Sequence, residues 1–146
     1  TALAPRGVAT LETAVPRPDT DVALAGYSYG EALSAPVVTF GTFAEAKGLN
    51  GEPDLVRLSA TTLPGDSGAA VLDASGAMLG MLLPRKQDAT HDLPKDVSFA
   101  ASGPAIASAL AANGITLAPA ATTGSLAAED LSERARAMTA LVSCWK

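Results

Sequence analysis

Six short apolar segments, separated by glycine, proline and small polar residues, constrain the fold of this chain most strongly. Their length, regular spacing and richness in Val, Leu and Ala are typical of β-strands joined by tight turns. Six strands in an open sheet would leave two exposed edges, whereas a closed barrel leaves none. We therefore expect an all-β fold, a six-stranded antiparallel Greek-key barrel followed by two C-terminal helices. The expected strands are Val22–Gly26, Val37–Phe43, Asp54–Ala60, Ala69–Asp73, Ala77–Leu83 and Val97–Ala101.

Composition limits both the size and the partners of the protein. A chain of 146 residues, 48% of them hydrophobic, fits a single domain with its own core. The net charge of −5 argues against nucleic acid as a partner, because phosphates require a basic surface. No apolar run reaches the ~20 residues of a membrane-spanning helix. Cys144 is the only cysteine, which excludes a disulfide within the chain.

Composition shifts divide the chain into four parts. Residues 1–20 contain prolines and one candidate strand at 7–15, and we expect them to be a linker or a strap from a preceding domain. Residues 21–113 form the expected barrel with its first helix, and residues 114–124 form a linker rich in Pro, Ala and Thr. Residues 125–146 are expected to form a C-terminal amphipathic helix.

The two helices have recognisable ends. The first is expected to begin near Pro104 and to stop at Asn113-Gly114. The second is expected to start at Ser125, a favourable N-cap residue. Its apolar stripe is expected to pack on the barrel, and a helix that binds a partner is the alternative. The stripe comprises Leu131, Ala135, Met138, Val142 and Trp145.

The run from Leu63 to Asp73 contains a candidate nucleophile. Ser67 stands between two glycines in a tight turn that leads directly into an apolar strand. Such a turn exposes and orients a hydroxyl, and the backbone N–H groups of Gly65 and Ser67 are candidates for an oxyanion hole. A serine also needs a base, and no histidine precedes this turn.

Four short motifs carry a resemblance to a known family. They are Ala25–Gly30, Pro64–Gly68, Gly76–Leu83 and Val97–Ala100. Their order resembles the C-terminal half of a trypsin-like (chymotrypsin-fold) serine peptidase, especially the bacterial trypsin-like and HtrA-type branch. The chain departs from the family motif at Ala69-Ala70, where Gly-Pro is usual.

The resemblance implies a function and a set of site residues. Ser67 would be the nucleophile, Gly65 and Ser67 would form the oxyanion hole, and Asp66 would organise the loop. Thr61 would lie at the floor of the substrate pocket, where a neutral hydroxyl favours a small or apolar substrate side chain. A catalytic His and Asp would come from an N-terminal barrel outside this chain, which would be inactive alone. The resemblance implies a peptide or protein substrate, a periplasmic or secreted location, and no cofactor.

Other interpretations are also open. The run Gly-Tyr-Ser-Tyr-Gly around Ser28 matches the nucleophile elbow of α/β-hydrolases, although Pro36 leaves room for only about one helical turn after it. His91 is the only histidine and thus the only imidazole base that this chain can supply. Asp88, His91 and Asp92 are a candidate metal site, although we expect no metal. A non-catalytic barrel that serves as a binding or assembly module is the rival to the enzyme.

Overall fold

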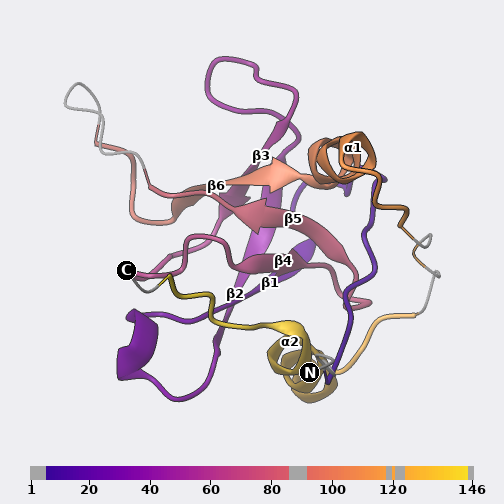
Figure 1. Ribbon diagram of the computed structural model, residues 1–146. Coiled ribbons are helices and arrows are strands. Elements are labelled where there is room, and N and C mark those ends of the chain that lie inside the picture. Colours follow the sequence, from indigo (N-terminus) through magenta and orange to yellow (C-terminus); the bar gives the residue numbers. More distant parts are fainter. Residues whose placement is uncertain (1–5, 86–91, 118–119, 121–123, 145–146) are drawn as a thin grey trace.

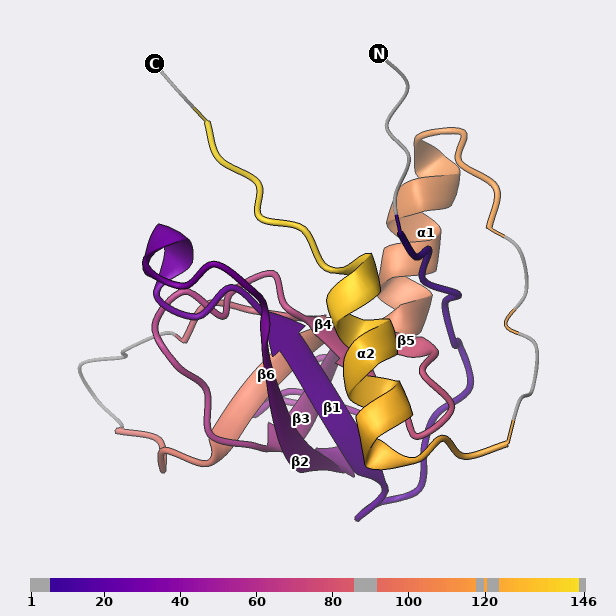
Figure 2. The ribbon, with the colours of Figure 1, turned by 90° about the horizontal axis from the view of Figure 1, so that it is seen from below.

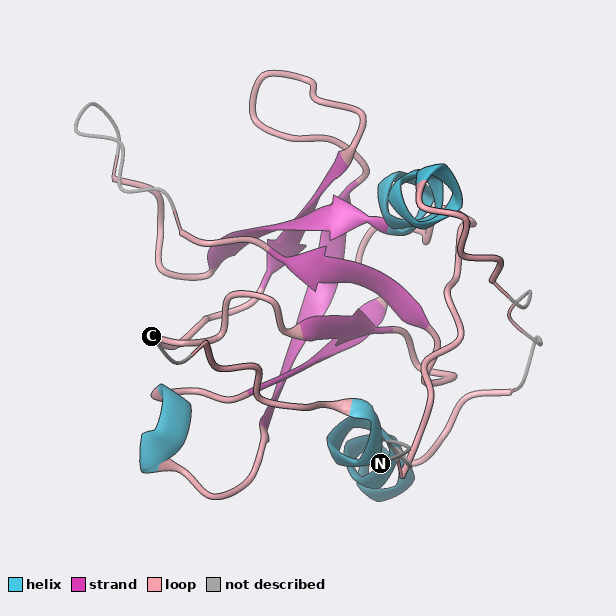
Figure 3. Cartoon of the chain, in the orientation of Figure 1, coloured by secondary structure: helices cyan, strands magenta, loops and turns pink. Residues whose placement is uncertain are grey.

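The computed structural model describes residues 6–85, 92–117, 120 and 124–144 of the chain. Six strands form a closed barrel, with one helix at its end and another on its side (Figures 1 and 3). A 3-10 turn, η1, follows the first strand. The elements are β1 (Asp21–Gly26), η1 (Gly30–Ala32), β2 (Val37–Glu45), β3 (Leu55–Ser59), β4 (Ala70–Leu72), β5 (Met78–Leu82), β6 (Val97–Ser102), α1 (Gly103–Ala112) and α2 (Ala128–Met138).

The strand order around the barrel is β1-β2-β3-β6-β5-β4, and every neighbouring pair is antiparallel. After three consecutive strands the chain returns so that β4 lies beside β1, which is the Greek-key arrangement. Each expected strand is present within two residues of its predicted ends. The predicted fold class is therefore confirmed.

Alternation along β1 separates two apolar clusters. Val22 and Leu24 point into the barrel and join its main core, which includes Phe43. Ala23 and Ala25 point outward and are equally buried, because α2 covers them. Successive strand residues face opposite sides, so one strand contributes to both clusters.

Helix α2 docks on the outer face of β1 and contacts β2, and residues of β4 complete the cluster beneath it (Figure 2). Its buried residues, Leu131 and Ala135, pack against the two outward alanines of β1 and against Leu72. The small alanine side chains let the helix backbone approach the sheet closely. The prediction that this helix packs on its own barrel is thus confirmed for Leu131 and Ala135.

The ends of α2 differ from the prediction. The helix begins at Ala128 rather than at Ser125, because the N–H of Leu126 donates to the carbonyl of Ala74 at 2.8 Å and the N-cap residue, Ala127, is extended. Val142 lies beyond the last turn and is 86% exposed, so its predicted place in the buried stripe is wrong. Trp145 lies outside the described residues.

Helix α1 begins and ends as predicted. The hydroxyl of Ser102 accepts a hydrogen bond from the N–H of Ala105 at 3.2 Å, and Pro104 occupies the first turn. Asn113 is the C-cap, and Gly114 follows with a φ of 74°. No helix in the described part of the chain is long and apolar enough to cross a membrane.

The segment before β1 contacts β5 at Met78 instead of forming a strand of its own. Leu11 is buried and makes a single parallel bridge to Met78. The flanking bonds run from the N–H of Glu12 to the carbonyl of Met78 and from the N–H of Met78 to the carbonyl of Thr10, both at 2.8 Å. The candidate strand at 7–15 is therefore reduced to one bridge.

Truncation of the α2 anchor is expected to destabilise the barrel. Leu131→Ala removes a buried side chain from the cluster under α2 and should lower the free energy of unfolding by about 2–5 kcal/mol, the range for such cavities. Val142→Ala is the matched control, since that side chain is in water and should change stability by less than about 0.5 kcal/mol. Urea unfolding of both variants measures the difference, and equal stabilities would contradict the docking of α2.

Candidate active site

The loop between β3 and β4 holds Ser67 at the surface. Ser67 is exposed and is flanked by Gly65 and Gly68, whose φ angles are +92° and +86°. Glycine adopts this left-handed conformation without a steric penalty. The N–H of Gly68 donates to the carbonyl of Leu82 at 2.8 Å, which ties the loop to the end of β5. The sharp turn therefore presents the hydroxyl of Ser67 from a fixed backbone.

Asp66 anchors the loop through hydrogen bonds to its side-chain carboxylate. Its side chain is buried, and its two carboxylate oxygens accept hydrogen bonds from two directions. The hydroxyl of Ser28 donates to Oδ1 at 2.5 Å, and the N–H of Leu63 donates to Oδ2 at 2.7 Å. These bonds join the turn after β1 to the loop that carries Ser67, which we call the nucleophile loop after its predicted role, 38 residues further along the chain.

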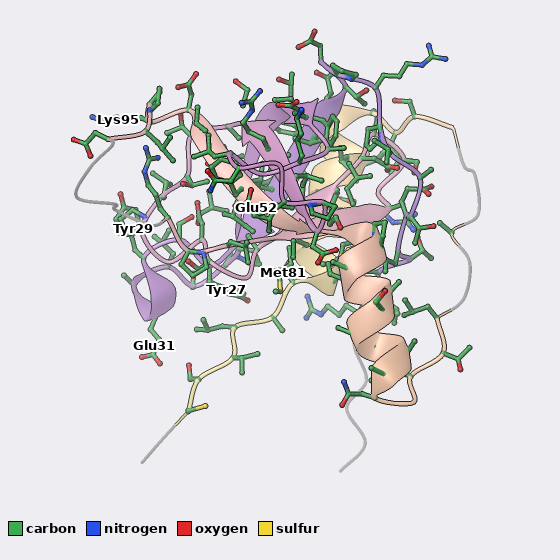
Figure 4. The ribbon with its side chains drawn as sticks, turned by 90° about the horizontal axis from the view of Figure 1, so that it is seen from above. Tyr27, Tyr29, Glu31, Glu52, Met81 and Lys95 are labelled. Atoms are coloured by element: carbon green, nitrogen blue, oxygen red, sulfur yellow. The ribbon has the colours of Figure 1, made fainter. Side chains whose placement is uncertain are left out.

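The same two turns also meet through their backbones. The N–H of Tyr29 donates to the carbonyl of Pro64 at 2.6 Å. A Cβ atom on Gly65 would lie 2.9 Å from both the carbonyl oxygen of Tyr27 and the nitrogen of Tyr29. Only glycine fits there, since backbone atoms cannot move aside as the end of a flexible side chain can. Figure 4 shows Tyr27 and Tyr29 on this turn, with the carboxylate of Glu31 pointing away from the barrel.

Two backbone donors next to the candidate nucleophile are unoccupied in the described part of the chain. Within the described ranges, the N–H groups of Gly65 and Ser67 donate to no other residue, and the hydroxyl of Ser67 has no partner. Unpaired N–H groups beside an exposed hydroxyl are available to an oxygen of a bound ligand, as an oxyanion hole requires. The geometry is compatible with the predicted roles of both residues.

Ser28 does not have the surroundings of a nucleophile. Its side chain is 1% exposed and donates its proton to Asp66. The turn leads into η1, which has three residues, and not into the long helix that a hydrolase elbow needs. The closed antiparallel barrel also excludes the parallel sheet of that fold. The α/β-hydrolase alternative is therefore wrong.

A pocket of about 260 Å³ lies beside Ser67, and we call it the Ser67 pocket. Thr61, the predicted floor residue, is exposed and does not line it. The neighbouring Thr62 lines it instead. Sequence reasoning missed two of the lining residues, Thr62 and Arg85, because they belong to no motif and only the packing of β5 against the loop brings them together. The pocket is lined by Thr62, Leu63, Pro64, Gly65, Asp66, Ser67, Leu82, Leu83 and Arg85.

The described part of the chain contains no histidine. His91 and Asp88 lie outside the described residues, so neither the candidate base nor the candidate metal site is tested by the structure. Cys144 is exposed with a free thiol. An imidazole base for Ser67 is therefore not found among the residues that the structure describes.

Comparison with known proteins agrees with the observed fold. The family model of the trypsin-like peptidase domain matches residues 2–81. Solved structures of the Rv3671c protease are similar in fold. The active form from M. tuberculosis is 21% identical with a TM-score of 0.56, and the alignment covers 78% of this chain and 51% of that one. An inactive form is 22% identical, also with a TM-score of 0.56, and covers 73% of this chain and 55% of that one.

The closed six-stranded barrel is thus that of a trypsin-like peptidase domain. The chain belongs to the trypsin-like peptidase domain family. A relative from Sinorhizobium fredii (strain NBRC 101917 / NGR234), the uncharacterized protein y4bJ, is 32% identical over 130 residues, which are 84% of this chain and 20% of the relative. The chain therefore spans a fifth of that relative and about half of each solved protease chain.

Proposed function

We propose that this chain is the nucleophile-bearing barrel of a trypsin-like serine endopeptidase. The observation that carries the proposal is the exposed hydroxyl of Ser67 beside the unoccupied N–H groups of Gly65 and of Ser67 itself, on a loop held by Asp66. The chain spans about half of each solved protease chain, which leaves room for the N-terminal barrel that the family uses to supply its His and Asp. In this proposal the substrate is a peptide or protein, and an N-terminal barrel pairs with this chain to complete the active site.

The proposed reaction is hydrolysis of a peptide bond through an acyl ester on Ser67. The Ser67 oxygen attacks the scissile carbonyl carbon while its proton passes to the histidine of the partner barrel. The carbonyl oxygen becomes an oxyanion and accepts hydrogen bonds from the N–H groups of Gly65 and Ser67. Cleavage of the C–N bond returns the proton to the leaving amine and leaves an acyl ester on Ser67. Water, deprotonated by the same histidine, then hydrolyses the ester.

Labelling with a fluorophosphonate tests this proposal on the full-length protein. The reagent is expected to modify Ser67, and mass spectrometry identifies the labelled peptide. Ser67→Ala should abolish labelling. Ser132→Ala is the control, because that hydroxyl only donates to the Ala128 carbonyl within α2. An unlabelled full-length protein would instead favour the non-catalytic binding or assembly module.

Ser28 is proposed to position the nucleophile loop. Ser28→Ala leaves Oδ1 of the buried Asp66 without its donor, and a buried unsatisfied group costs about 1–3 kcal/mol. We expect the free energy of unfolding to fall by that amount and labelling of Ser67 to become slower without being abolished. Urea unfolding and labelling kinetics of the full-length variant measure the two effects.

Ser98→Ala is the matched control for that variant. Ser98 is also buried and also bonds across 38 residues, but its hydroxyl donates to a neutral carbonyl, that of Ala60, at 2.9 Å. Ala60 keeps a second bond through its N–H to the carbonyl of Asp96. Ser98→Ala should therefore lower stability while labelling of Ser67 keeps its rate. Equal labelling rates in both variants would contradict a positioning role for Ser28.

A further inference from the structure

The Ser67 pocket is lined by two charged residues, Asp66 and Arg85. A substrate side chain that enters the pocket can pair with whichever of these two charges is not already engaged within the protein. The two residues differ in this respect. Asp66 accepts hydrogen bonds from Ser28 and Leu63, whereas Arg85 forms no ion pair with any carboxylate that the structure describes.

The carboxylate oxygens of Asp66 are already hydrogen-bonded within the protein. Each of its oxygens already accepts a hydrogen bond, from the hydroxyl of Ser28 and from the N–H of Leu63, and the residue is buried. A cationic substrate side chain would have to displace one of these donors to pair with it. Asp66 is therefore a poor partner for a basic substrate residue.

The guanidinium of Arg85 is held in place by neutral carbonyl groups. It donates to the carbonyls of Leu93, Pro94 and Lys95 at 2.7, 2.8 and 3.1 Å. These three bonds use one hydrogen of Nη1 and both hydrogens of Nη2, so two of the five guanidinium N–H groups have no partner among the described residues. Carbonyl dipoles fix the position of a cation and leave its net charge in place.

No carboxylate in the described ranges forms an ion pair with Arg85. The acidic residues on either side of its carbonyl partners, Asp92 and Asp96, are exposed and make no bond to it. The pocket contains a second free donor in Thr62, whose hydroxyl has no hydrogen bond within the described part of the chain. A fixed cation and a free hydroxyl together suit an anionic oxygen ligand.

We propose that the Ser67 pocket selects an acidic substrate side chain, with Arg85 as the residue that determines this specificity. The proposal rests on the proposed peptidase function and names its substrate class, a glutamate or aspartate side chain next to the bond to be cleaved. It replaces the small or apolar preference that Thr61 suggested, because Thr61 lies outside the pocket. Hydrogen bonds to charged groups are stronger than neutral ones, which gives the anionic side chain its advantage.

Peptide binding to the full-length protein tests this selectivity without requiring turnover. The protein carries Ser67→Ala, and the probes are an N-acetylated tripeptide that ends in glutamate and its glutamine counterpart. Their terminal carboxylates are identical, so any difference in affinity comes from the side chain. Calorimetry is expected to give about ten- to a hundredfold tighter binding of the glutamate peptide, the range for a hydrogen bond to a charged group.

Variants assign the preference to one residue. Arg85→Gln, added to the same protein, should bring the two affinities together, and Arg85→Lys should keep a weaker preference for glutamate. Arg57→Gln is the control, because Arg57 pairs with Glu45 on the barrel surface at 2.9 Å and does not line the pocket. It should leave the preference unchanged.

The outcomes separate the two proposals. Equal binding of the two peptides, no binding of either, or a glutamate preference that survives Arg85→Gln would each overturn the assignment to Arg85. A lack of fluorophosphonate labelling together with a preference that depends on Arg85 would reject the peptidase and keep an acidic-peptide site. Labelling of Ser67 together with equal binding would keep the peptidase and reject the acidic preference.

Discussion

The isolated 146-residue chain is expected to hydrolyse peptide bonds about a million times more slowly than the full-length protein, the loss measured when the base of a serine peptidase is removed. Ser67 would then have to lose its proton to water while it attacks. The unoccupied N–H groups of Gly65 and Ser67 can supply only the residual rate of an oxyanion hole. Fluorophosphonate labelling of both proteins at equal concentration tests the same loss of the base, and the isolated chain is expected to remain unlabelled.

This comparison requires proof that the isolated chain is folded. Dispersed amide resonances and cooperative unfolding would show that the barrel is intact, so that inactivity reflects the missing base. Strong labelling of the folded chain alone would contradict the prediction. It would then make His91, the one histidine of the sequence, the leading candidate for the base, and His91→Ala would decide that question.

The sequence predicts the barrel well because its strands follow local rules. Each strand is a short apolar run bounded by turn residues, and six such runs favour closure whatever the details of their packing. The ends of α1 are equally local, since Ser102 and Asn113 act within one turn of the helix. The start of α2 is not local. Ser125 is a good N-cap in isolation, but the long-range bond between Leu126 and Ala74 overrides that preference.

The candidate site also has one part that follows from local sequence and another that depends on long-range contacts. Ser67 and its glycines stand in one continuous motif, and the structure places them in the turn that the motif predicts. The bond between Ser28 and Asp66 and the position of Arg85 depend on how distant segments meet, and no spacing in the sequence encodes that. A Gly-x-Ser-x-Gly run predicts an exposed serine, yet here the same serine is buried as a donor to Asp66.

Gly65→Ala is expected to reduce labelling of Ser67 in the full-length protein by about a hundred- to a thousandfold, the loss measured when an oxyanion donor is removed. Two independent effects act on this position. The φ of +92° is unfavourable for any side chain, and the new Cβ would lie 2.9 Å from backbone atoms of Tyr27 and Tyr29. The loop must shift to relieve that contact, and the N–H of Gly65 shifts with it.

Gly51→Ala separates the two effects. Gly51 has a similar φ of +83°, lies in the loop between β2 and β3, and has open space where its Cβ would be. That variant is expected to lose about 1–2 kcal/mol of stability from the backbone conformation alone and to keep the labelling rate of the parent protein. If Gly65→Ala labelled as fast as Gly51→Ala, the contact with the turn after β1 would not hold the nucleophile loop. The link between the two turns would then serve only stability, because a displaced oxyanion donor cannot leave the rate unchanged.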